Sequence, residues 1–131
     1  MANRRLNQFR YSLETAVVDL YMQVSFGASG APTLVTTSPA TNQGIVSITR
    51  NAAGKYTILL QDSYVRLMKA THNFIGASAP ASPGMFVVSD SSSNLASPTI
   101  QIQFNAAGVS TDPASGDVVQ LQLTLKNSSV Q

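Results

Sequence analysis

His72 is the only histidine in this sequence of 131 residues, which contains no cysteine and no tryptophan. Without cysteine the chain can form no disulfide, perform no thiol chemistry and build no Cys/His zinc site. A Ser-His-Asp triad would depend on His72 alone, because a general base needs an orienting partner and a nucleophile within reach. No Gly-x-Ser-x-Gly motif is present. We interpret His72 as a surface or interface residue and predict that the protein is not an enzyme.

The sequence contains six acidic residues, and no local arrangement of them indicates a catalytic site. Asp112 and Asp117 flank the turn Asp-Pro-Ala-Ser-Gly-Asp, where carboxylates and carbonyls could hold a calcium ion. Aspartate is more commonly a turn-forming residue in such a segment, and the sequence leaves both interpretations open. There is no EF-hand, P-loop or Gly-x-Gly-x-x-Gly pattern. We predict no cofactor and no small-molecule substrate.

Residues 1–11 form a basic segment in which aromatic and basic side chains alternate, with Arg4, Arg5, Phe9 and Arg10 as its main groups. Such an arm could be a disordered terminus, could bind nucleic acid through phosphates and base stacking, or could dock on a neighbouring subunit. In the last case the arginines would pair with carboxylates and the aromatic rings would act as anchors. We predict this third role for the four residues.

The charge content is low. The chain has 8 Lys+Arg and 6 Asp+Glu, and only 11% of its residues are charged, against roughly 25% in average soluble proteins. Beyond the arm the basic residues are dispersed, unlike the stripe typical of duplex-binding proteins. An uncharged polar surface favours contact with other proteins, so binding to nucleic acid is not expected. The apolar stretch 16–24 is interrupted by Asp19 and Gln23, and we predict neither a membrane-spanning segment nor a signal peptide.

A period of two dominates the chain and predicts β-strands. Residues 15–26 alternate well, although a helical period also fits them. Further strands are expected near 33–37, 44–50, 55–60, 73–77, 85–89, 100–104 and 119–126. Asn51-Ala-Ala-Gly54 predicts the turn of a hairpin over 45–60, and the same tetrapeptide recurs at 105–108. Asp62 and the apolar residues after it predict one short helix near 62–69.

Seven or eight short strands with turn signals between them predict an all-β fold, either an antiparallel β-sandwich or a jelly-roll-like small barrel. We expect a single β domain over residues 12–131 that follows the N-terminal arm. Its core is predicted to contain Val18, Leu20, Val46, Ile48, Ile58, Leu60, Ile100, Ile102, Phe104, Leu121, Leu123 and Leu125.

Three segments, Val24-Ser-Phe-Gly-Ala-Ser-Gly-Ala-Pro-Thr-Leu34, Gly44-Ile-Val-Ser-Ile-Thr-Arg50 and Gly54-Lys-Tyr-Thr-Ile-Leu-Leu-Gln-Asp-Ser-Tyr64, resemble a pattern in small virion proteins of tailed bacteriophages. The resemblance covers about residues 17–68 and is strongest to capsid decoration (cement) proteins. It implies a β-rich homo-oligomer, with a trimer favoured, that binds the major capsid protein outside the head and stabilises contacts between capsomers in the virion. The arm would then contact the capsid protein or a sister subunit.

Other functions remain open at this point. A tail, neck or fibre-base protein of the virion would have a similar composition. An RNA-binding coat protein of a small RNA phage has a similar length, but such chains end in helices, whereas residues 118–126 predict a strand. A carbohydrate-binding β-sandwich usually exposes a platform of tryptophan or tyrosine, and Tyr11, Tyr21, Tyr56 and Tyr64 show no platform pattern in the sequence.

Overall fold

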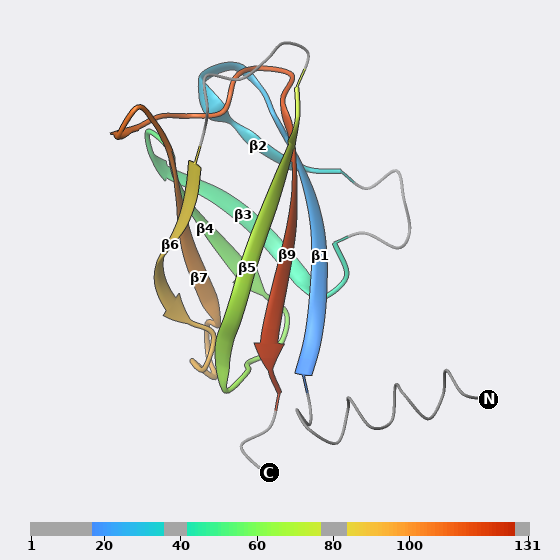
Figure 1. The fold of residues 1–131 in the computed structure, drawn as a ribbon. Coiled ribbons are helices and arrows are strands. Elements are labelled where there is room, and N and C mark those ends of the chain that lie inside the picture. The colour runs from blue at the N-terminus through green and yellow to red at the C-terminus, as the bar shows by residue number, and fades with distance from the viewer. Residues whose placement is uncertain (1–16, 36–41, 77–83, 128–131) are drawn as a thin grey trace, which may run out of the picture.

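The computed structural model describes residues 17–35, 42–76 and 84–127. In them, two antiparallel sheets pack against each other (Figure 1), which confirms the predicted all-β sandwich. Sheet A has the strand order β2 (Pro32–Leu34), β1 (Val17–Phe26), β9 (Val118–Lys126) and β5 (Arg66–Ile75). Sheet B has the order β3 (Ile45–Ala52), β4 (Lys55–Leu60), β7 (Thr99–Ala106) and β6 (Gly84–Ser91), and β8 (Val109–Ser110) pairs with β7.

Alternating side chains fill the space between the sheets. Every second residue of β1 and β9 is buried, and the residues between them face outward, as a half-buried antiparallel sheet requires. Aromatic rings lie at the centre of the core, where Phe26, Tyr56 and Phe104 contact one another edge to face. The alternative helical interpretation of residues 15–26 is wrong for the described part of that segment, because β1 pairs with β9 from Val17 to Ser25.

Two copies of the tetrapeptide Asn-Ala-Ala-Gly make two hairpin turns. Ala52 pairs with Lys55 at the end of the predicted β3–β4 hairpin, and Ala106 pairs with Val109 between β7 and β8. The glycine at the end of each copy has a positive φ, 72° at Gly54 and 79° at Gly108. Glycine takes this conformation without a steric penalty, which explains why one turn sequence serves twice.

The helix predicted near 62–69 is absent. Residues 61–65 form bends, and β5 begins at Arg66. The backbone N–H of Tyr64 donates to the carbonyl of Ser92, and that of Val65 donates to the carbonyl of Lys126. These two hydrogen bonds connect the segment to other parts of the sandwich. A helix of about two turns is not stable by itself, whereas β5 pairs with β9 along its length and so gains its hydrogen bonds from the sheet.

Val46 was predicted in the core and is instead 54% exposed. The ladder between β3 and β4 shifts between Ile45 and Ser47, so one extra residue, Val46, sits in a β-bulge. A bulge reverses the in-and-out alternation, which is why Ile45 becomes buried while Val46 faces outward. Val18 and Ile48 pack at the margin of the core, and the other predicted core residues are buried.

The predicted arm, residues 1–11, lies outside the described residues. Within the described ranges, no helix has the length and hydrophobicity needed to cross a membrane.

Candidate functional site

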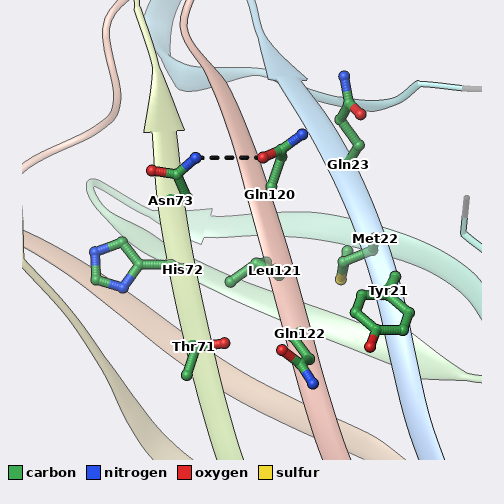
Figure 2. A pocket seen from close by; sticks show the side chains of 9 residues that line it. All are labelled: Tyr21, Met22, Gln23, Thr71, His72, Asn73, Gln120, Leu121 and Gln122. Carbon is green, nitrogen blue, oxygen red and sulfur yellow. Dashed lines mark hydrogen bonds between the residues drawn. The ribbon is translucent and has the colours of Figure 1, made fainter.

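The outer face of sheet A carries a shallow depression of about 470 Å³ over strands β1, β9 and β5. Its outward side chains form two rows across the strands (Figure 2), set by the pairing of Tyr21 and Thr71 with Gln122 and of Gln23 and Asn73 with Gln120. We call these six side chains the polar face. All are uncharged and capable of hydrogen bonding, and they comprise Tyr21, Gln23, Thr71, Asn73, Gln120 and Gln122.

Two sets of hydrogen bonds hold this face in place. The Nδ2 of Asn73 donates to Oε1 of Gln120 at 3.3 Å, which joins the side chains of β5 and β9 in one row. Beside β1, the backbone N–H of Asn42 donates to the carbonyl of Tyr21 at 2.9 Å, and the N–H of Gln23 donates to Oδ1 of Asn42 at 2.8 Å. The backbone on this side of the depression is therefore anchored.

His72 does not build a catalytic arrangement with this depression. Its ring points away from the two polar rows (Figure 2) and packs edge to face on Phe74, with ring centroids 5.6 Å apart. Among the described residues no hydrogen-bond partner of its imidazole is found. His72 is therefore a half-buried side chain that packs at the margin of sheet A.

The most connected polar group is Asp112, which joins three loops. Arg50 donates to it from Nε at 3.0 Å and from Nη2 at 2.8 Å, an ion pair with two hydrogen bonds. The backbone N–H of Gly54 donates to its Oδ1 at 2.7 Å. The buried hydroxyl of Tyr56 lies 3.0 Å from the same oxygen and 2.8 Å from the carbonyl oxygen of Gly30, so its proton is shared between two acceptors. The carboxylate has a structural role.

Asp117 confirms the turn-forming interpretation. Its Oδ2 accepts a hydrogen bond from the N–H of Ala114 at 3.1 Å, and its own N–H donates to the carbonyl of Ala114 at 3.0 Å. Asp112 forms an ion pair with Arg50. Within the described ranges, no group of three or more His, Cys, Asp or Glu side chains could hold a metal ion.

The Asp112 ion pair makes stability depend on pH. Its hydrogen bonds from Arg50, assisted by the Gly54 N–H, hold the pKa of Asp112 below the usual value, while partial burial opposes them. A lowered folded-state pKa contributes stability above the ordinary aspartate pKa near 4, and this contribution is lost as the pH falls through the lower folded value. Burial raises the pKa of the Tyr56 hydroxyl above its usual value, so this hydroxyl stays protonated.

We therefore expect Asp112→Asn to lower the free energy of unfolding by about 1 kcal/mol at pH 7, a modest figure because the carboxylate is partly exposed. The difference from the wild type should be smaller at about pH 3 than at pH 7, because protonation of the carboxylate removes part of the ion pair's contribution. Urea unfolding at both pH values measures this difference in unfolding free energy, and Asp62→Asn controls for the loss of one negative charge. An Asp112→Asn difference that is the same at both pH values would contradict this role.

Comparisons with protein-family models, with curated proteins and with solved structures found no match to this chain. The four predicted contact residues, Arg4, Arg5, Phe9 and Arg10, lie outside the described residues, so their role stays a prediction. Sequence analysis missed the pairing of Arg50 with Asp112, which are 62 positions apart and share no local signal. The alternation of residues 119–126 is sufficient to place Gln120 and Gln122 on one face of a strand, but their alignment with β1 and β5 depends on the strand register.

Proposed function

We propose that the protein is a non-enzymatic structural protein of a phage virion. In this proposal it is a capsid decoration (cement) protein that binds the major capsid protein outside the head and stabilises contacts between capsomers. The β-sandwich fold is compatible with the resemblance of residues 17–68 to small virion proteins. A protein that binds only the assembled shell makes the shell more resistant to rupture, by mass action.

The observation that carries the proposal is where the exposed apolar side chains lie. Strands β3, β5 and β6 are edge strands, and five of the nine exposed large hydrophobic side chains in the described residues lie on them: Val46, Met68, Ile75, Phe86 and Val88. Edge strands with exposed apolar side chains favour association with other chains, and proteins that work alone usually protect them. This pattern is what a protein that functions through its neighbours requires.

A homotrimer is the oligomer we propose, since a trimer at a three-fold position of a capsid matches the symmetry of its target. Linked contacts also allow modest affinity per subunit to give tight overall binding. In this arrangement the arm residues Arg4, Arg5, Phe9 and Arg10 contact the capsid protein or a sister subunit.

Binding to heads of the phage that encodes the chain tests the proposal. The full chain is mixed with expanded empty heads that lack it, and its occupancy is measured after sedimentation. We expect saturation at roughly one trimer per three-fold position. Replacing the four arm residues by alanine should reduce occupancy at least about tenfold, whereas the control Lys55→Ala, at an exposed position of the inner strand β4, should have little effect.

Other outcomes reject the proposal in distinct ways. Binding to purified tails and not to heads would identify a tail, neck or fibre-base component. Binding to RNA with an affinity that falls steeply with salt would favour the RNA-phage coat protein. Absence from purified virions by mass spectrometry would remove the virion role altogether.

A further inference from the structure

We propose that the polar face of sheet A is a binding site for a neutral oligosaccharide. The sequence shows no tyrosine platform, but the described tyrosines differ in their exposure to solvent. Tyr56 and Tyr64 are buried, whereas Tyr21 is 54% exposed at the edge of the depression. The inference does not rest on the proposed virion role and uses other side chains than the exposed apolar ones named for that role.

The size of the depression suits a sugar chain. Its volume of about 470 Å³ is within the range of roughly 300–1,000 Å³ common for ligand sites. Neighbouring strands lie about 4.8 Å apart and alternate residues about 6.7 Å apart along a strand, so the six side chains form a grid of roughly 10 by 7 Å. This is the footprint of one or two sugar rings lying across the strands.

The chemistry of the side chains selects a neutral polyol. Each amide of Gln23, Gln120 and Gln122 offers both donors and an acceptor, and a sugar hydroxyl is itself both donor and acceptor. The described residues that line the depression include no lysine, arginine, aspartate or glutamate, so they offer no opposite charge to a phosphate or carboxylate ligand. The nearest charged pair across the strands is Asp19 and Lys69, one row further along, on either side of Thr124.

Part of the site is ordered before any ligand arrives. The hydrogen bond between Asn73 and Gln120 leaves the Oδ1 of Asn73 and the Nε2 of Gln120 as a fixed acceptor and donor on the surface. Among the described residues, the side chains of Gln122 and Thr71 have no hydrogen-bond partner. Fixed polar groups lose little conformational freedom on binding. The ring of Tyr21 offers an apolar surface for the C–H face of a sugar.

The test begins with the labelled full chain on an array of neutral and acidic glycans, followed by calorimetry with the neutral glycan retained best. We expect Tyr21→Ala to raise its Kd at least about tenfold and Gln122→Ala about fivefold. The matched controls on sheet B, Phe86→Ala and Gln101→Ala, should change Kd less than about twofold. Raising NaCl from about 0.05 M to about 0.5 M should leave Kd nearly unchanged, because no charge is involved.

Three results would overturn the inference. The first is the absence of any retained neutral glycan on the array. The second is retention of acidic glycans alone, with affinity that collapses in salt. The third is a loss of head occupancy by Tyr21→Ala and Gln122→Ala without any glycan binding, which would assign the polar face to a protein partner. Unchanged melting temperatures of these exposed variants establish that they are folded, and failure of the head-binding experiment leaves the glycan result unaffected.

Discussion

Gly54→Ala is expected to lower the free energy of unfolding by about 4 kcal/mol, against about 1 kcal/mol for Gly108→Ala. The two glycines end identical tetrapeptides and have similar positive φ values, 72° and 79°. A Cβ at Gly54 would lie 2.6 Å from the carbonyl oxygen of Phe104 and 2.7 Å from the backbone nitrogen of Thr111, whereas nothing lies within 4 Å of a Cβ at Gly108. Only the backbone could move to relieve the contact at Gly54.

Relief of that contact would break further interactions. The N–H of Gly54 donates to Asp112, and its carbonyl accepts from the N–H of Phe104 at 2.8 Å. Moving this turn away from β7 would therefore also weaken the hydrogen bond between the Gly54 N–H and Asp112. Urea unfolding of both variants measures the effect, and Gly108→Ala serves as the control because it carries the conformational cost alone. Equal losses of unfolding free energy in the two variants would show that the close backbone contacts at Gly54 add nothing to the conformational cost.

Phe104→Ala is expected to cost about 4 kcal/mol, in the range for removal of a buried aromatic ring. The ring is 1% exposed and contacts Phe26, Tyr56 and Phe74 edge to face, with centroid distances of 6.0, 5.7 and 5.6 Å. It lies on sheet B, while Phe26 and Phe74 lie on sheet A, so its loss opens a cavity between the sheets. The control is Phe86→Ala, at an exposed position, for which we expect a change within about 0.5 kcal/mol.

The same variant tests how the core supports the polar face. Phe74 lies on β5 next to Asn73, and its contact with Phe104 holds this edge strand against sheet B. Loss of the ring should therefore speed hydrogen exchange of β5 amides more than of the central strand β9. Unchanged unfolding in urea, or uniform exchange across sheet A, would contradict this account of the core.

Part of the candidate site could be predicted from the sequence. Alternation in 118–126 places Gln120 and Gln122 on one face because side chains of a strand point to opposite sides in turn. Their alignment with Tyr21 and Thr71 could not be predicted, because it depends on the register between strands that are far apart in the chain. The pairing of Asp112 with Arg50 could not be predicted for the same reason, because the two residues are 62 positions apart.

Two sequence-based predictions failed where tertiary contacts outweighed local preference. The segment after Asp62 has the residues of a short helix, but a helix of about two turns is not stable by itself, and from Arg66 onward the chain pairs with β9 instead. Val46 follows the alternation of its neighbours, but the bulge in β3 turns it outward. The ion site at Asp112 and Asp117 was an open possibility, and the pairing of Asp112 with Arg50 gives that carboxylate a different role.

By itself, the sequence determined most of the strands, the glycine turns and the all-β class, because side-chain alternation and positive φ act between residues that are close along the chain. The tertiary structure alone decided which strands neighbour each other, which carboxylate is neutralised and which polar side chains share a face. These features depend on contacts between distant segments, such as Asp19 and Thr124, which lie 105 positions apart, and such contacts form only when the strands assemble into sheets and the sheets into a sandwich.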